Sequence, residues 1–106
     1  MFKITNHIKG YIGGTYDTAP IPSGFQITFE NGNTISVQFG FGNYCSNTYE
    51  SKPESLTAEI AIWDKDKNWH QFEGDTVKGW VGADKVADWI KFAQSNTIIN
   101  EVREDI

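Results

Sequence analysis

Four oxygen-bearing side chains come closest to a chemical motif in this sequence. Asp64, Asp66, Asn68 and Asp75 stand at positions 1, 3, 5 and 12 of a calcium-binding loop. The motif requires Gly at position 6, where this sequence has Trp69, and a bidentate Glu at position 12. The flanking segments are predicted strands rather than helices. We therefore predict a polar, solvated hairpin turn here and no metal site.

Soft ligands and nucleophiles are scarce. His7, Cys45 and His70 have no zinc-motif spacing, and a structural zinc site needs four nitrogen or sulfur ligands. A catalytic Cys45–His70 pair would have to form in space, whereas a lone cysteine is more often a small buried hydrophobic side chain. Glycine-rich phosphate-binding motifs are also missing from the sequence. We expect a protein that is not an enzyme, with no catalytic residues and no cofactor.

Alternating apolar and polar residues predict the strands that would position any site. Residues 25–30 and 34–39 alternate with period two, which is typical of strands with one buried face. Asn31-Gly32 lies between them and predicts a hairpin with a primed turn, in which both residues take a positive φ. A further strand is predicted at residues 57–63. Residues 69–72 would return antiparallel to it, and residues 2–12 and 77–81 would add strands.

The periodicity changes after residue 82. Val86, Trp89, Ile90 and Ala93 recur at helical spacing, which predicts a helix over residues 83–94 with one apolar face. The expected fold is α+β, an antiparallel sheet of about four to five strands with one C-terminal helix packed on one face. At 106 residues, the chain is expected to form a single domain over residues 1–106.

The charge distribution restricts the class of partner. Fourteen acidic and nine basic residues give a net charge of −5, without the basic stripe of a nucleic-acid groove. The acids are too interspersed with bases for a DNA mimic. One cysteine fits a reducing compartment, and no apolar signal core or membrane-spanning run is present. We expect a cytoplasmic protein that contacts neither a membrane nor nucleic acid directly.

Residues 40–55 form a long stretch without periodicity, and such loops are usually functional or disordered. Their amides and amphipathic rings suit an adaptable recognition surface, and Cys45 would anchor the loop inward. We predict partner-binding residues at Asn43, Tyr44, Asn47 and Tyr49. The alternative is an ordered loop whose aromatic rings cover the edge of the core.

Three tryptophans, Trp63, Trp69 and Trp80, fall outside the predicted helix. They are expected to cluster on the other face of the sheet. An exposed cluster would be a recognition surface, whereas a covered one would be a second minor core.

Three stretches resemble small phage and prophage proteins without an assigned function: GNYCSN at residues 42–47, AEIAIWD at 58–64 and GDTVKGWV at 74–81. The resemblance covers roughly residues 11–93 and brings no catalytic residue. It implies an accessory protein of a mobile element, made in the cytoplasm of a bacterial host. By analogy with anti-CRISPR proteins, it implies a non-enzymatic inhibitor that binds a host protein or protein complex. The alternatives are a small-ligand-binding protein or enzyme with an unrecognised pocket, and a virion-associated structural component.

Overall fold

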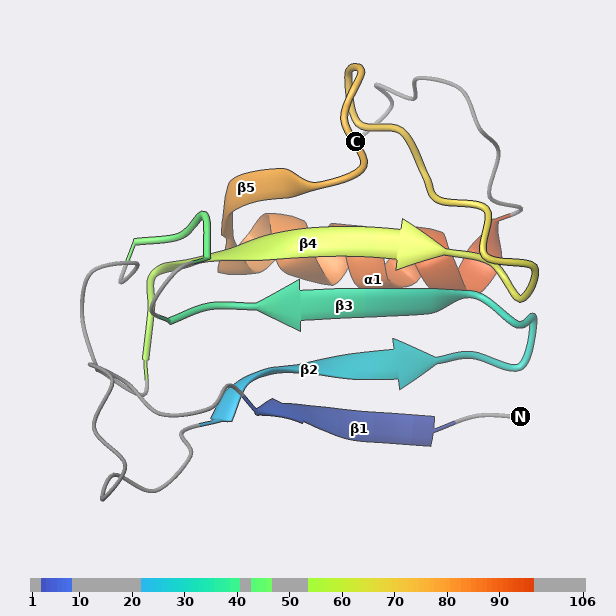
Figure 1. Cartoon of the computed structure of the whole chain (residues 1–106), viewed down its shortest axis with the longest axis horizontal. Helices are drawn as coiled ribbons and strands as arrows, with labels where there is room; N and C mark the ends of the chain where they lie inside the picture. Colours follow the sequence, from blue (N-terminus) through green and yellow to red (C-terminus); the bar gives the residue numbers. More distant parts are fainter. Residues whose placement is uncertain (1–2, 9–21, 41–42, 47–53, 97–106) are drawn as a thin grey trace.

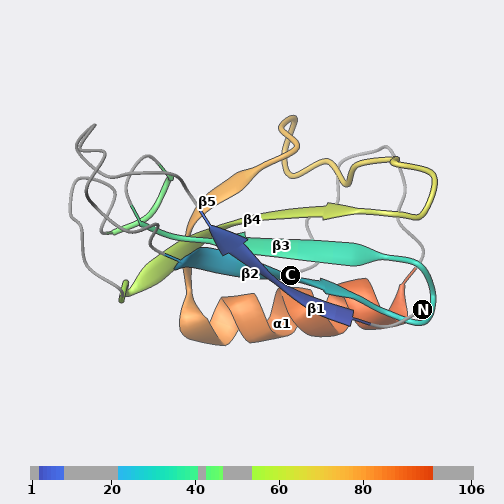
Figure 2. The ribbon, with the colours of Figure 1, turned by 60° about the horizontal axis from the view of Figure 1, so that its bottom comes forward.

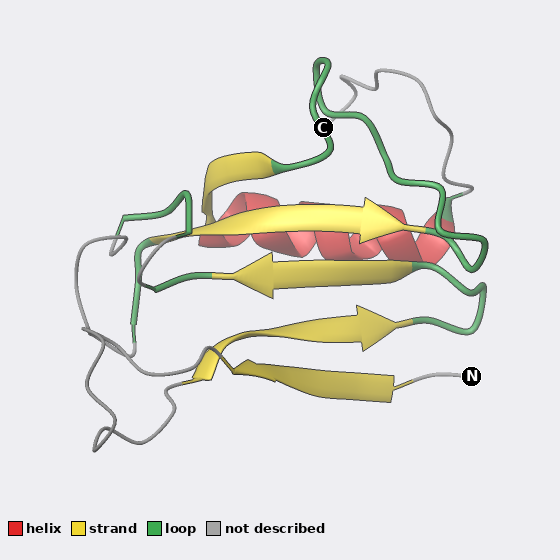
Figure 3. Cartoon of the chain, viewed as in Figure 1, coloured by secondary structure: helices red, strands yellow, loops and turns green. Residues whose placement is uncertain are grey.

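The computed structural model describes residues 3–8, 22–40, 43–46 and 54–96, and it confirms the α+β prediction. Five antiparallel strands lie side by side in chain order, and one helix packs against a single face of the sheet (Figures 1 and 3). The elements are β1 (Lys3–Ile8), β2 (Pro22–Thr28), β3 (Thr34–Gln38), β4 (Thr57–Trp63), β5 (Lys78–Gly82) and α1 (Ala83–Ser95).

The core lies between the sheet and α1 because the strand register aligns the apolar residues. Ile35 of β3 is opposite Ile27 of β2 on one side and Ile62 of β4 on the other. Residues directly opposite each other point to the same face, so the apolar side chains of neighbouring strands meet there. The helix covers β3, β4 and β5 on this face (Figure 2). Trp89 and Ala93 are buried as predicted, and Phe92 joins them.

The first hairpin does not have the predicted primed turn. Gly32 donates its backbone N–H to the carbonyl of Phe29 at 2.9 Å, and the N–H of Phe29 reaches the carbonyl of Asn33 at 2.8 Å. Gly32 has a positive φ of 90°, but Asn31 does not. This pattern is a turn followed by a glycine bulge, one residue longer than a primed turn.

In this longer turn, Asn31 forms hydrogen bonds with the helix. Its side-chain amide donates to the carbonyls of Ala93 and Gln94 at 3.1 and 3.0 Å. Asn33 donates to Ala93 and Asn96 at 2.9 and 2.6 Å. Carbonyls in the last turn of a helix have no partner within the helix. The first hairpin therefore caps the C-terminal end of α1.

The predicted strand at residues 69–72 is wrong, and β5 takes its place beside β4. Only an isolated bridge joins Trp69 to Trp63. Glu73 and Gly74 both have positive φ, 48° and 92°, the conformation of a primed turn. This turn pairs Phe72 with Asp75 directly, so the chain leaves β4 after the bridge at Trp69.

His70 and Phe72 instead extend the core beyond the edge of β4. His70 is fully buried, and its ring lies 4.8 to 5.6 Å from the rings of Phe72, Trp89 and Phe92. Its backbone N–H donates to the carbonyl of Ile62 at 2.8 Å. The helix is therefore fixed by an aromatic cluster as well as by the sheet.

Candidate functional site

The sequence predicted a turn at Asp64–Asn68, and the structure has one, closed by hydrogen bonds to the Asp64 side chain. Asp64 Oδ1 accepts the backbone N–H groups of Asp66 and Asn68, each at 2.9 Å, and Oδ2 accepts the side-chain amide of Asn68 at 3.0 Å. These bonds, the backbone N–H of Asn68 foremost, lower the pKa of Asp64. The Asp64 carboxylate therefore stabilises the turn. Within the described ranges, no group of three or more His, Cys, Asp or Glu side chains could hold a metal ion.

The three tryptophans of the sheet's other face are divided between two places. Trp63 and Trp69 lie together, with ring centroids 4.7 Å apart, and the ammonium group of Lys67 lies 6.0 Å from the Trp63 ring. Trp80 lies elsewhere and contacts Tyr44. The predicted cluster of three is therefore a pair, and Trp80 belongs to another site.

The predicted partner-binding residues have different environments. Asn43 is buried, and its amide donates to the carbonyl of Phe39 at 2.9 Å, so it holds the loop together. Cys45 is also buried, with Sγ 3.5 Å from the carbonyl oxygen of Gly40. Tyr44, between them, is 58% exposed. Asn47 and Tyr49 lie outside the described residues.

Residues 43–46 are tied to the start of β4. The backbone N–H of Tyr44 donates to Glu59 Oε2 at 3.0 Å, and Ser46 bonds Thr57 Oγ1 through its N–H and its hydroxyl, both at 2.8 Å. Thr57 and Glu59 alternate with the core residues of β4, so they point away from α1. The segment accordingly lies on the side of the sheet opposite the helix (Figure 2).

The neighbouring strand has a bulge at this point. Ala58 pairs with Val81 and Ile60 with Lys78, so Gly79 and Trp80 together oppose the single residue Glu59. Trp80 has a φ of 50°, a left-handed conformation that bulky residues rarely adopt. Its N–H donates to the carbonyl of Tyr44 at 2.8 Å. The bulge therefore joins β5 to the loop segment.

Gly79 permits this close approach. A Cβ at this position would lie 2.6 Å from the Cβ of Tyr44 and 3.1 Å from its carbonyl oxygen. Any larger residue would push Tyr44 away from the sheet. A glycine inside a strand pattern often marks a bulge or a close backbone approach, so the sequence contained this signal.

The two rings form an exposed pair, which we call the aromatic platform (Tyr44 and Trp80). Their centroids are 5.6 Å apart with an interplanar angle of 24°, an offset stack. Tyr44 is 58% and Trp80 60% exposed. Exposure of two large rings to water is unfavourable by itself. The sequence prediction included Tyr44 but missed its contact with Trp80.

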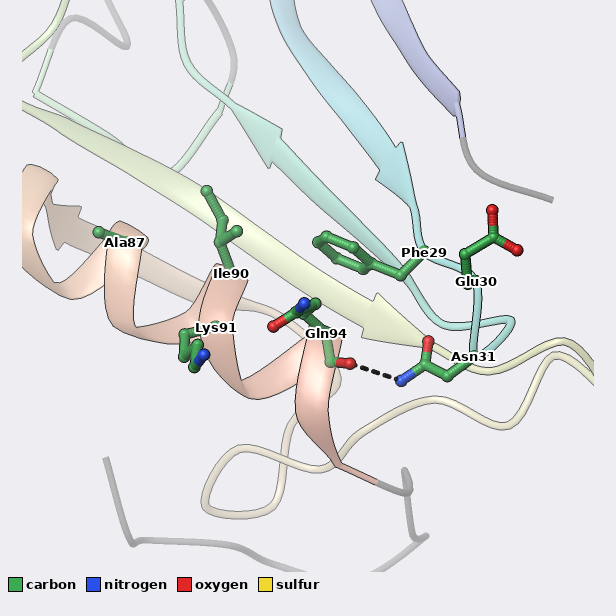
Figure 4. A pocket seen from close by; sticks show the side chains of 7 residues that line it. All are labelled: Phe29, Glu30, Asn31, Ala87, Ile90, Lys91 and Gln94. Carbon is green, nitrogen blue, oxygen red and sulfur yellow. Dashed lines mark hydrogen bonds between the residues drawn. The ribbon is translucent and has the colours of Figure 1, made fainter.

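A concave site lies on the helix side of the sheet, between the first hairpin and α1. This groove encloses about 430 Å³, and Phe29 and Ile90 line its apolar part (Figure 4). Its other lining residues are Glu30, Asn31, Ala87, Lys91 and Gln94. The amide of Asn31 is engaged with the helix end. The groove thus offers an apolar surface with a polar rim.

Comparison of the chain with family models, curated proteins and solved structures found no match. No helix in the described part of the chain is long and apolar enough to cross a membrane. Fold and site together define the class: an α+β protein with an exposed, stacked aromatic pair opposite its helix.

Proposed function

We propose that this protein acts by binding another protein through the aromatic platform. The observation that carries the proposal is the outward stack of Tyr44 and Trp80, with more than half of each side chain exposed. Tyrosine and tryptophan are enriched at the centres of protein interfaces because they supply large contact area. They lose little conformational entropy on binding.

The backbone of the platform is fixed before any partner arrives. Tyr44 is held at its N–H by Glu59 and at its carbonyl by Trp80. Trp80 keeps a left-handed conformation that costs on the order of 1–3 kcal/mol and occurs preferentially at functional sites. A fixed surface avoids part of the ordering cost of association. This arrangement supports a contact surface rather than a covering for the core.

The resemblance to phage and prophage proteins supports a more specific proposal. The partner is a protein or protein complex of a bacterial host defence system, and the protein inhibits it by steric occlusion in the host cytoplasm. Occlusion needs only a complementary surface and no catalytic residue. The acidic surface, with a net charge of −5, favours a partner with a basic face.

The groove favours a second candidate function, the binding of a small apolar ligand. Its volume of about 430 Å³ lies within the range of small-molecule sites. Ala87 lines the groove, and its side chain is exposed. Replacing it with Phe would reduce the volume without touching the platform, so Ala87→Phe separates this function from the first.

The experiment is capture of the partner from a phage-sensitive bacterial host that carries the defence system, using the tagged full chain. Trp80→Asn removes the ring and keeps a residue that tolerates a positive φ. We expect it to weaken the complex more than tenfold, about 1.4 kcal/mol. Ile4→Asn is the matched control, because Ile4 is also exposed (66%) but lies on β1 at the far edge of the sheet.

Equal binding by wild type and Trp80→Asn, or equal loss in Ile4→Asn, would contradict the proposal. Co-purification with virus particles instead of a host complex would favour a virion component. If Ala87→Phe abolishes the protein's activity in the host while Trp80→Asn and Ile4→Asn do not, the ligand-binding function is favoured. Melting temperatures of all variants show whether each one is folded.

A further inference from the structure

A carboxylate lies beside the aromatic platform. Glu59 is the single residue opposite the bulge of Gly79 and Trp80, and its Oε2 accepts the N–H of Tyr44 at 3.0 Å. The other carboxylate oxygen, Oε1, accepts no hydrogen bond from the described residues. The platform therefore has a negative charge at its edge with one oxygen left to accept a donor.

Lys78, the basic residue directly before the bulge, does not neutralise the charge of Glu59. Lys78 pairs with Ile60, which is fully buried on the helix side of the sheet. Opposed residues in antiparallel strands share a face, so Lys78 is placed on the face opposite to Glu59. Lys78 is therefore not placed to pair with the Glu59 carboxylate.

The rings add a second attraction for cations. The two rings are stacked on each other, and more than half of each side chain remains exposed to solvent. Aromatic faces carry partial negative charge and attract a cation within about 6 Å, tryptophan most strongly. Stacked rings and an adjoining carboxylate thus favour the same kind of ligand.

We infer that the aromatic platform binds an arginine side chain of the protein partner, with the guanidinium stacked on Trp80 and donating to Glu59. This inference rests on the proposed function. The planar guanidinium can stack on a ring while its N–H groups donate within the plane, whereas the lysine ammonium is a compact point charge without a planar face. A proline residue offers Glu59 no donor of its own, and a phosphate would be repelled by the carboxylate. A sugar hydroxyl can donate to Glu59 but carries no positive charge to pair with it.

The direct test uses small probes on the full chain, followed by NMR of the Trp80 indole N–H. The probes are N-acetyl-arginine amide, N-acetyl-lysine amide, N-acetyl-proline amide and methyl glucoside. The Trp80 signal is assigned by its loss in Trp80→Asn. We expect the arginine probe to shift this signal more than the other three do, and the shift to diminish with salt. A larger shift with proline or glucoside, or none with arginine, would overturn the inference.

Glu59→Gln tests the charge without removing the support of Tyr44, because the glutamine oxygen can still accept its N–H. We expect the affinity for the arginine probe to fall about two- to fivefold, within the range of an exposed charged pair. The affinity for the proline probe should stay the same. An unchanged arginine affinity in Glu59→Gln would overturn the inference.

The partner complex separates this inference from the function on which it rests. If Trp80→Asn no longer binds the partner while Glu59→Gln binds it normally, the platform is a protein-binding surface but does not recognise an arginine side chain. If Trp80→Asn retains the partner, both proposals fail. Weaker partner binding by both variants, with competition by N-acetyl-arginine amide, supports both.

Discussion

The side-chain amide of Asn33 donates a hydrogen bond to the carbonyl oxygen of Ala93 at 2.9 Å, across 60 residues of the chain. Asn33 is 4% exposed and Ala93 is fully buried, so this bond is shielded from water. No basic residue stands in the last turn of α1 to bind its carbonyls. The asparagines of the first hairpin take that role and fix the helix on the sheet.

Asn33→Ala should lower the free energy of unfolding by about 2 kcal/mol, because buried carbonyls would lose their donor. Asn31→Ala removes a similar donor from an exposed position and should cost less, about 1 kcal/mol. Urea denaturation of both variants measures the difference. A smaller loss for Asn33→Ala than for Asn31→Ala would show that the shielded bond is not the important one.

Trp89→Ala should destabilise the protein by about 3–5 kcal/mol through the cavity it leaves. Trp89 is 2% exposed, and its ring meets the rings of Phe72 and Phe92 edge to face at 4.9 and 5.3 Å. Trp69→Ala is the matched control, since Trp69 is 38% exposed. Thermal unfolding followed by circular dichroism gives both values. An unchanged melting temperature in Trp89→Ala would mean that the helix docks through other residues.

The strands and the helix could be predicted because each has its own local period. The alternation at Ile60 and Ile62 and the helical spacing of Val86 and Trp89 each require burial of one face, whatever surrounds them. The predicted helix over residues 83–94 differs from the observed Ala83–Ser95 by one residue. The turn after Phe29 was mispredicted because Asn-Gly suits more than one turn, and contacts with a distant helix select among them.

The site was predicted less completely because it depends on contacts between distant residues. Tyr44 and Trp80 meet through a bulge and a loop that share no sequence period. Asn43 looked suited to recognition because it carries an amide, but its amide bonds the carbonyl of Phe39 inside the loop. Residue type alone does not distinguish an amide that binds a partner from one that satisfies the backbone.

The hydrogen bonds at Asp64 predict a pH effect on stability. The N–H donors of the turn hold the pKa of Asp64 below its usual value in the folded state. This group therefore stabilises the fold above its unfolded pKa of about 3.9, and the contribution is lost as the pH falls through the lower folded pKa. Asp64→Asn should show a shallower fall in melting temperature below about pH 4 than the wild type.

Asp66→Asn is the control for this pH series, because the bonds described at the turn end on the carboxylate of Asp64 and not on that of Asp66. Its melting temperature should follow the wild-type curve. Parallel curves for the wild type and Asp64→Asn would show that the turn does not contribute to acid stability.

The turn at Lys67 predicts a stabilising substitution. Its backbone bonds, Asp64 N–H to Asn68 and Lys67 N–H to Asp64, repeat those of the first hairpin, where Gly32 stands in place of Lys67. Lys67 has a φ of 65°, which glycine adopts without strain. Lys67→Gly should raise the free energy of unfolding by about 0.5–1 kcal/mol. The opposite kind of change, Gly32→Ala, should lower the free energy of unfolding. If urea denaturation shows that both substitutions stabilise or both destabilise the protein, the two turns do not have equivalent requirements.

Gly79→Ala should disrupt the aromatic platform from beneath. The added Cβ would meet the Cβ of Tyr44 at 2.6 Å, so residues 43–46 must move and the stack with Trp80 must open. We expect a stability loss of about 1–3 kcal/mol, measured by urea denaturation. Partner affinity should fall more than tenfold, about 1.4 kcal/mol, measured on the purified complex.

Trp80→Asn separates these two losses, because it removes the ring but leaves the bulge and the glycine intact. Asparagine tolerates a left-handed backbone better than tryptophan, and Trp80 is 60% exposed, so little buried area disappears. Its stability should therefore stay within about 1 kcal/mol of the wild type, while its partner affinity falls as far as that of Gly79→Ala. Full partner affinity in Gly79→Ala, with the stability lowered as expected, would show that the stacked geometry is not what the partner recognises.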